Sequence, residues 1–511
     1  MLLDMLWKDL IRVNGYIKRG ETMLSISEIK AHIDRDRISA KKKEARVGER
    51  YYNGDNDIRQ YRIFYIDKDG KPQEDKNRSN IKKPSNFFKE NVDECVSYFL
   101  SGDKRKVLSD DPMLQSYLDE YFDDDFIDEF GELLSYTLRQ GRAWLYGYKN
   151  KEDRLSFKAC GDIGIVQVEA KYAGDKQDHI LFYYPEHDIT EDKIVTKIQD
   201  WTKEFTVYYE EKDGEIKVDK YYEINPRPHI IYKDVKDNLT YDTFGFIPFW
   251  DIENNKEHAS DLKPIKEHID NYDLMNCGLS NDLVDLSQGF YVVKGFYGDN
   301  IDEMILNLQA RKHIGVDPDG DVDIKTVNIP YEARKTQMEI DEKNIYRFGF
   351  AFNSNNVGDG NITNVVIKSR YTLLDLKCEA LEKKARKLLR RILEPIIDEI
   401  NEVNGTGYTI KNVYFNFERE MIVNELDNAQ IELVKAQTKQ TNINTILSVS
   451  TTLGQELVQE QICTELELDF DDIKDKLPKQ ETIDIDAASE ELANIPTDET
   501  SEEVEEEVPT A

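Results

Sequence analysis

Residues 365–403, which read VVIKSRYTLLDLKCEALEKKARKLLRRILEPIIDEINEV, carry the longest helical pattern in the sequence. Apolar residues recur in it three and four positions apart, and this spacing predicts a helix with one buried face. The residues of that face are Leu374, Cys378, Leu381, Ala385, Leu388, Ile392, Ile396 and Ile400. Pro395 lies within the pattern and predicts a kink or a break near its position. We therefore expect a long helix at the centre of the fold.

Two shorter helical patterns, at about 259–288 and 330–347, precede this helix and enclose a small insert. The insert predicts a short α/β unit with a strand at 291–294, a helix at 301–313 and a strand at 321–328. A break rich in Gly and Asn, residues 349–364, joins the second pattern to the long helix. The expected order is therefore helix, insert, helix, flexible break and long helix.

The N-terminal half mixes helices with strands. Helical patterns cover 1–45, 84–101 and 111–139, with a capping signal at Ser25–Ile26–Ser27–Glu28. Asp67–Lys68–Asp69–Gly70 predicts a turn between two short strands, and a period of two from Ala143 to Ile231 predicts an antiparallel sheet. After the long helix we expect a strand pair near 408–418 and helices at about 420–439 and 442–469. These elements together predict the α+β fold class.

Composition limits the classes of function. The chain has 511 residues and a net charge of −34, whereas a protein that grips DNA tightly normally has a basic surface. Its five Cys are scattered without a CxxC, which argues against disulfides and zinc and indicates a reducing cytoplasm. No apolar run approaches the ~18 residues of a membrane span, and the first residues do not resemble a signal peptide. Residues 480–511 hold 12 acidic and no basic residues, so we expect a disordered tail.

Motifs of catalysis and cofactor binding are missing from the sequence. It has no P-loop, HExxH or GxSxG, and its seven His lack the spacing of metal ligands. The acidic turn Asp317–Asp323 resembles half of a calcium loop, but Val322 and Asn328 stand where Gly and Glu are needed. Asp123–Asp125, with Asp128 and Glu129, could serve a two-metal nuclease, although a helical surface explains this cluster better. A basic run, Lys377–Arg391, lies opposite the apolar stripe and is interpreted as a solvated or subunit-contacting face. We therefore expect no catalytic, cofactor or metal site.

Several segments together resemble the portal proteins of long-tailed phages, of the type found in phages of Gram-positive bacteria. The strongest runs from Gly245–Phe249 through Asn254–Asn255 and Ser260–Asp261–Leu262 to Ile269–Asp273, similar to the family's "G.IPfi.f.NN....SDl..ik.lIDaYd". The other segments are Arg50–Ile58, Asn77–Arg78, Asn86–Lys89, Tyr98–Gly102, Arg139–Gly147 and Gly289–Gly295. The resemblance covers about residues 40–470.

The resemblance implies an α+β portal fold with a wing, a helical stem, an α/β clip and a helical crown. The implied domains are an N-terminal segment 1–25, wing 26–258, stem helix 259–288, clip 289–329, stem helix 330–348, tunnel loop 349–364, long wing helix and strands 365–419, crown 420–479 and acidic tail 480–511. It also implies a ring of about twelve subunits at one capsid vertex of the virion, assembled in the bacterial cytoplasm.

Partners and contact residues follow from the same resemblance. The implied partners are the terminase large subunit, head–tail adaptor proteins, scaffold, the major capsid protein and double-stranded DNA passing through the channel, with no membrane. The expected channel residues are Lys335, Lys343, Asn353, Ser354, Asn355, Asn356, Lys368 and Arg370. In the clip, Phe296 and Tyr297 are expected to contact partners or to pack between subunits. Two alternatives stay open at this point: another connector or scaffold protein, and a metal-dependent nuclease.

Overall fold

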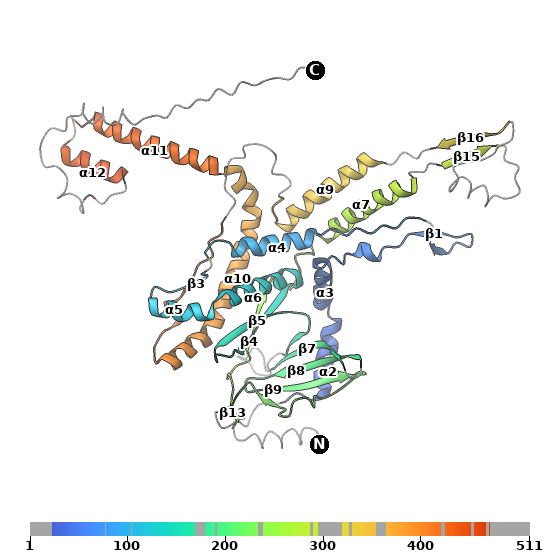
Figure 1. Ribbon diagram of the computed structural model, residues 1–511, viewed down its shortest axis with the longest axis horizontal. Coiled ribbons are helices and arrows are strands. Elements are labelled where there is room, and N and C mark those ends of the chain that lie inside the picture. The colour runs from blue at the N-terminus through green and yellow to red at the C-terminus, as the bar shows by residue number, and fades with distance from the viewer. Residues whose placement is uncertain are drawn as a thin grey trace. The chain divides into compact units, whose positions relative to one another are not determined.

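The structure is a computed structural model that describes residues 23–76, 78–103, 105–168, 179–189, 192–233, 239–286, 290–294, 319–325, 330–353, 364–420, 425–450, 454–466 and 470. It divides into two compact units, residues 1–422 and 423–511 (Figure 1). The predicted helix 301–313, the acidic tail and the start of the expected N-terminal helix lie outside the described residues. In the part that is described, no helix has the length and apolarity needed to cross a bilayer.

The helices of the first unit largely follow the predicted patterns. They are α2 (Ile26–Ile38), α3 (Ala40–Tyr52), α4 (Phe87–Leu100), α5 (Pro112–Tyr121), α6 (Asp124–Gln140), α7 (Lys266–Leu286), α9 (Tyr331–Gly349) and α10 (Asn364–Asn404). The predicted capping signal is confirmed, because Ser25 and Glu28 form a reciprocal capping box. The single helix expected at 111–139 is wrong: Asp123 caps a new helix by accepting from the Phe126 amide at 2.8 Å. Residues 261–265 form turns, so α7 begins later than predicted.

Two sheets replace the single sheet predicted for Ala143–Ile231. The larger has the order β10-β9-β8-β7-β6, with β11 beside β9, and the smaller has the order β14-β4-β5. Their strands are β4 (Arg142–Lys149), β5 (Leu155–Gly161), β6 (Ile165–Val168), β7 (His179–Asp188), β8 (Lys193–Trp201), β9 (Phe205–Lys212), β10 (Glu215–Val218), β11 (Arg227–Pro228) and β14 (Phe249–Glu253). All of these pairings are antiparallel.

Four shorter pairings complete the strands of this unit. β1 (Phe64–Ile66) pairs with β2 (Pro72–Glu74), β12 (Ile230–Lys233) with β13 (Leu239–Asp242), and β15 (Phe290–Lys294) with β16 (Asp321–Lys325). β17 (Tyr414–Phe415) pairs with β3 (Val107–Leu108). The strand pair predicted near 408–418 is therefore wrong, because only one strand forms there and its partner comes from far away in the sequence. A 3₁₀ turn occupies Ile410–Asn412 instead.

The core of the first unit is built around α10. All eight apolar residues of its predicted stripe are at most 2% exposed. They pack in one cluster with side chains of α4, α6 and the smaller sheet. The helix continues through Pro395 without a break, because Ile392 and Ile396 on either side are fully buried and hold the chain in place. A second cluster packs α2 on the larger sheet, and a third joins the two sheets through Trp144, Trp201 and Phe249.

The second unit contains two helices, α11 (Glu425–Ser448) and α12 (Gln455–Glu465). Two helices form as predicted, but the break expected at 440–441 is wrong, because α11 continues through it to Ser448. Val458 and Cys463 of α12 are buried. Asn442 of α11 donates to Glu465 at 3.2 Å, so the two helices contact each other.

Candidate functional site

Helices α7 and α9 form an antiparallel pair joined by polar side chains. The buried carboxylate of Asp341 on α9 lies 3.0 Å from His268 Nδ1 and accepts from Asn271 Nδ2 at 2.6 Å. Near the other end of the pair, Arg334 of α9 forms a 2.7 Å ion pair with Asp282 of α7. Because the end of one helix meets the start of the other, the chain between them returns beside its starting point.

The segment Arg50–Ile58 meets the start of α7. Lys266 lies 2.6 Å from Asp57 and 2.7 Å from Asp270, and the Tyr51 hydroxyl donates to Asp270. Burial alone would raise the pKa of Asp57, but hydrogen bonds from Lys266 and Arg50 outweigh it and lower that pKa to about 2. Arg50–Ile58 and Ile269–Asp273, two of the segments that carry the family resemblance, are therefore bonded to each other at the start of α7.

A ladder of hydrogen bonds holds residues 79–85 along α7, and we call this extended segment the strap. The amides of Ser85, Lys83, Ile81 and Ser79 donate to Asp273 Oδ1 (2.8 Å), Cys277 Sγ (3.2 Å), Asn281 Oδ1 (2.7 Å) and Asp285 Oδ2 (3.1 Å). The acceptors stand four residues apart on the helix, a rise of ~6 Å. Alternate residues of an extended chain are ~6.6 Å apart. Because the spacing of the acceptors on the helix nearly equals the spacing of the amides along the strap, four hydrogen bonds form one after another.

The rest of the strap faces the chain that leads into the β1–β2 hairpin. Asn80 Nδ2 donates to the Tyr61 carbonyl at 3.2 Å, and Lys82 Nζ donates to the Arg59 carbonyl at 2.7 Å. Pro84 has no N–H, but it lies between Lys83 and Ser85, at a position that donates none of the four hydrogen bonds to α7. The ladder therefore loses no hydrogen bond at this proline. The strap was not predictable from the sequence, because its donors are backbone groups. The only visible signal was the polar stripe at every fourth position of α7.

The turn between β14 and α7 packs against the central part of α10. Asn254 Nδ2 donates to Asp261 at 2.6 Å, and Lys377 of α10 forms a 2.7 Å ion pair with the same carboxylate. Lys384 of α10 donates to the Asn254 carbonyl. Gly141 (φ +83°) is required beside this turn, because a Cβ there would lie 2.0 Å from the His258 carbonyl oxygen. The strongest segment of the resemblance thus forms a junction between α6, α7 and α10.

The basic run on α10 is divided between internal and exposed residues. Lys377, Lys384, Arg386 and Arg391 bond to groups of this chain, and Arg391 lies 3.0 Å from Asp251. Lys383, Lys387 and Arg390 are exposed. Three of the seven residues are therefore exposed, as a solvated or subunit-contacting face requires.

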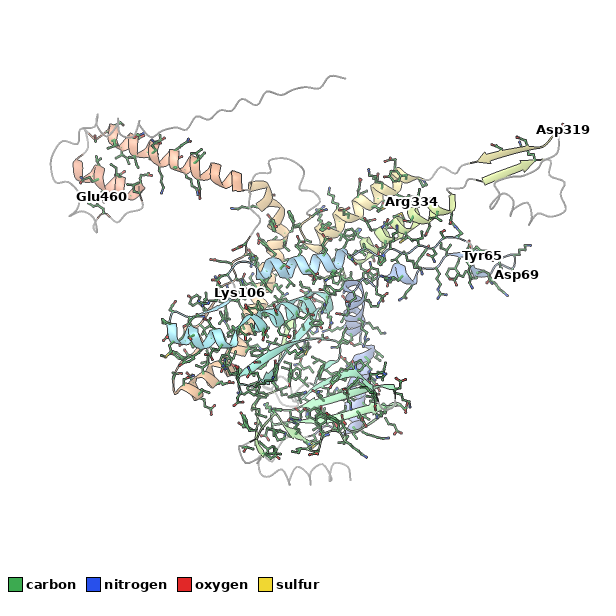
Figure 2. All side chains as sticks on the ribbon, in the orientation of Figure 1. Tyr65, Asp69, Lys106, Asp319, Arg334 and Glu460 are labelled. Carbon is green, nitrogen blue, oxygen red and sulfur yellow. The ribbon has the colours of Figure 1, made fainter. Side chains whose placement is uncertain are left out.

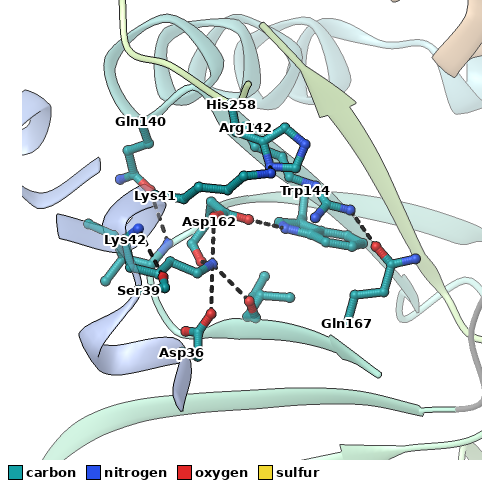
Figure 3. Close-up of polar contacts among 12 residues, drawn as sticks. Asp36, Ser39, Lys41, Lys42, Gln140, Arg142, Trp144, Asp162, Gln167 and His258 are labelled. Carbon is teal, nitrogen blue, oxygen red and sulfur yellow. Dashed lines mark hydrogen bonds and ion pairs between the residues drawn. The ribbon is translucent and has the colours of Figure 1, made fainter. Parts of the chain in front are cut away.

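A buried polar cluster joins α3 to the sheets (Figure 3). Lys42 forms a 2.5 Å ion pair with Asp162, and Trp144 Nε1 donates to the other oxygen of that carboxylate at 2.9 Å. Lys42 also donates to the Ile165 carbonyl at 2.9 Å. These paired charges therefore hold α3 against the sheets, because removing one partner would leave the other buried without compensation.

The acidic clusters take structural roles as well. Asp123 caps α6, and Glu129 accepts from the Ala159 amide at 2.7 Å. The described end of the calcium-like turn, Asp321 and Asp323, lies exposed on β16. Among the described residues no group of three or more acidic, His or Cys side chains is arranged to hold a metal ion.

The expected channel residues fall near the ends of α9 and α10. Lys335 and Lys343 are exposed on α9, and Lys335 lies 3.9 Å from Glu339. Lys368 is exposed on α10, and Arg370 belongs to the same helix. Asn353 Nδ2 donates to Glu342 at 3.4 Å. Ser354, Asn355 and Asn356, like Phe296 and Tyr297 of the expected clip, lie outside the described residues.

Comparisons with known proteins identify relatives along most of the chain. Residues 31–467 match the family "Phage portal protein, SPP1 Gp6-like". A portal protein of Bacillus phage SPP1 is 30% identical over 389 residues, 75% of each chain. A portal protein of Clostridium phage phiCD119 is 24% identical over 425 residues, 80% of this chain and 89% of that one.

Solved structures with some likeness were also found. Two of them are a neck of a native GTA particle (TM-score 0.34, 10% identity) and a neck of an empty GTA particle (TM-score 0.37, 12% identity), each covering 75% of this chain and 90% of the other. The family match extends over most of the sequence and agrees with the segments that join α3, α6, α7 and α10, and this chain belongs to the SPP1 Gp6-like family of phage portal proteins.

Proposed function

We propose that this portal protein forms a closed ring of about twelve subunits at one capsid vertex, through which DNA enters during packaging and leaves during ejection. The observation that carries the proposal is the antiparallel α7–α9 pair, rooted in the core at α3 and α10 and locked along its length. Such pairs can stand side by side in a ring and make a channel wall without exposed backbone groups.

The parts of the chain map onto this ring in the proposed arrangement. α7 and α9 are the stem helices of segments 259–288 and 330–348, and the β15–β16 hairpin belongs to the clip, residues 289–329. Segments 26–258 and 365–419 form the wing, and the second unit provides the crown, residues 420–479. Residues 349–364 form the tunnel loop.

DNA contact in this channel is weak and transient. Lys335, Lys343, Lys368 and Arg370 supply a few cations per subunit to a chain of net charge −34, so phosphate is attracted locally without being held. Asn353, Ser354, Asn355 and Asn356 add neutral hydrogen bonds that position the duplex. Deletion of residues 354–360 should leave ring assembly intact and reduce the amount of DNA packaged, and unchanged packaging would exclude this loop from the channel constriction.

The ring docks other proteins of the virion during assembly in the bacterial cytoplasm. The clip, including Phe296 and Tyr297, is proposed to contact the terminase large subunit first and head–tail adaptors afterwards. The ring also meets scaffold and the major capsid protein when it nucleates the shell. Ala at both clip positions should weaken terminase binding while rings persist.

Electron microscopy of the purified full chain tests the central proposal. We expect annular particles with a central opening wide enough for duplex DNA, at micromolar concentration and moderate salt. A chain that remains monomeric in light scattering under the same conditions would contradict it. The acidic tail is expected to be dispensable, so truncation after Lys479 should give rings of the same size.

A further inference from the structure

The outer face of α10 carries three exposed basic residues, Lys383, Lys387 and Arg390, which we call the basic stripe. An α-helix turns by ~100° per residue, so these residues lie within ~60° of one another around the axis and extend over ~10 Å. The opposite face of the helix is the apolar stripe, which is buried in the core. The basic stripe therefore points away from the core of its own chain.

The first half of α6 carries an acidic stripe of the same size, which consists of Asp125, Asp128 and Glu132. All three residues are exposed, whereas Phe126 and Phe130 on the other face of the helix belong to the core. These carboxylates also lie within ~60° of one another and extend over ~10 Å. The side chains of α6 and α10 are drawn on the ribbon in Figure 2. Two outward-facing stripes of opposite charge are thus present on one chain.

The spacings of the two stripes match when the helices run in opposite directions. Along α10 the basic residues are separated by four and then three positions, and along α6 the acidic residues are separated by three and then four. Two antiparallel helices with these stripes facing each other therefore form three pairs of opposite charge at equal heights. The pairs are Lys383 with Glu132, Lys387 with Asp128, and Arg390 with Asp125.

Exposed carboxylates on both sides of the basic stripe favour this register. If α6 moved one turn toward the C-terminal end of α10, Asp125 would meet Glu394. If it moved one turn the other way, Glu132 would meet Glu379. Like charges that meet across an interface are unfavourable. The order of charges along the two helices therefore selects one antiparallel register.

The two helices are attached at opposite edges of the smaller sheet. Arg391 of α10 lies 3.0 Å from Asp251 on the edge strand β14, and Glu129 of α6 accepts from the Ala159 amide on the other edge strand, β5, at 2.7 Å. A ring of identical subunits needs two different and complementary surfaces on each subunit. Helices at opposite edges of one sheet can supply these two surfaces.

We propose that the basic stripe of α10 docks antiparallel on the acidic stripe of α6 of an adjacent copy of this chain. This inference rests on the proposed ring and assigns one of its interfaces. DNA is a poorer partner for this face, because the exposed carboxylates of Glu379, Glu394 and Asp398 flank the three cations. Complementary charges act mainly on the choice of partner and the rate of association, so the contact selects the correct neighbour and its register.

Carbodiimide crosslinking in mixed rings tests the contact directly, because this reagent joins a Lys amine to a carboxylate that it touches. Rings are assembled from unlabelled and ¹⁵N-labelled chains. We expect isopeptide bonds from Lys387 of one isotope to Asp128 of the other, and from Lys383 to Glu132. The inference is overturned if these amines form no crosslinks, form them only within one chain, or reach only other carboxylates such as those of residues 480–511.

Charge reversal measures the contribution of the contact to assembly. Two variants reverse one stripe each: K383E/K387E/R390E and D125K/D128K/E132K. Each should raise the concentration at which half the chains are assembled by at least about tenfold. A chain with all six substitutions regains opposite charges at every pair and should return to within about threefold of the wild type. A folding defect of either variant would not be reversed by adding the other.

A control separates this contact from the effect of net charge. The variant K151E/K193E/K220E changes the charge by the same amount as reversal of the basic stripe, at exposed positions outside α6 and α10, and should leave assembly unchanged. The inference alone is rejected if both stripe variants assemble like the wild type, or if the chain with all six substitutions does not recover. A wild-type chain that never forms rings rejects the proposed function.

Discussion

α10 and α11 are both long helices, but only one of them is enclosed by its own chain. α10 has 41 residues, and its apolar stripe is buried from Leu374 to Ile400. α11 has 24 residues, and residues 432–440 are all exposed, including Leu433 and Val434 at more than half of their surface. Helix length in this protein therefore does not indicate a core.

The difference separates contacts that the single chain completes from contacts that it leaves open. α10 is held on its apolar face by the core and on its polar face by Asp261 and Asp251. α11, like the β1–β2 hairpin, shows apolar residues that no described part of the chain covers. The first group should determine the stability of one subunit, and the second should affect its association with other molecules.

Replacement of a stripe residue tests the first half of this comparison. Ile392→Ala leaves a cavity at a position with 0% exposure, so we expect the free energy of unfolding to fall by about 2–5 kcal/mol. Leu433→Ala in α11 should change it by less than about 0.5 kcal/mol. Denaturant unfolding below the concentration of ring assembly measures both. Equal losses would remove the distinction between the two helices.

The polar attachment of α10 can be tested within its basic run. Lys377→Met leaves Asp261 half-buried without its cation, and we expect a loss of about 2–3 kcal/mol, because the partner of a removed charge stays desolvated. Lys383→Met, in the same run but exposed, serves as the matched control and should be neutral. A neutral Lys377→Met would mean that α10 is held by its apolar face alone.

A smaller effect is expected for the strap. Asn281→Ala removes the acceptor of the Ile81 amide and should cost about 1 kcal/mol, with faster hydrogen exchange confined to residues 79–83. Asn276→Ala, on α7 but outside the ladder, is the control. Unchanged exchange in the Asn281 variant would show that the strap is held by other contacts.

The sequence predicted those parts of the fold in which the type of a side chain depends directly on whether its position is buried. The stripe of α10 was visible because burial on a helix requires apolar residues at fixed spacing. Within the predicted sheet, β8 interrupts the alternation with charged residues that have partners inside the sheet: Asp200 lies 2.7 Å from His179, and Lys197 lies 2.8 Å from Asp219. Buried ion pairs remove the alternation by which a strand is recognised.

Contacts made by backbone groups were harder to predict. Most of residues 79–85 belong to no predicted helix or strand, yet four of their amides bind α7. The convergence of Arg50–Ile58 with the start of α7 was also not predictable, because side-chain partners about 200 residues apart leave no local pattern. The family resemblance named these segments without showing that they touch.

The smallest expected effect concerns Glu94 of α4, which holds the chain just after α9. Its carboxylate accepts from the Phe352 amide at 3.1 Å. Burial, assisted by Glu90, raises its pKa to about 7, although the Phe352 amide partly opposes this. An unfolded Glu titrates near ~4.3, so between these values the folded chain binds more protons than the unfolded chain, and its stability falls as the pH rises through this window.

Glu94→Gln keeps an acceptor oxygen for Phe352 but cannot ionise, so it should lack this loss of stability. Between pH 5 and pH 8 we expect the melting temperature of the wild type to fall by about 1 °C more than that of the variant. The difference is small because the melting temperature of a large unit responds weakly to a change in its unfolding free energy. Glu402→Gln, at an exposed position of α10, should follow the wild type. If Glu94→Gln shows the same pH dependence as the wild type, the carboxylate is solvated. The segment after α9 would then be one of the parts that the single chain leaves without a completed contact.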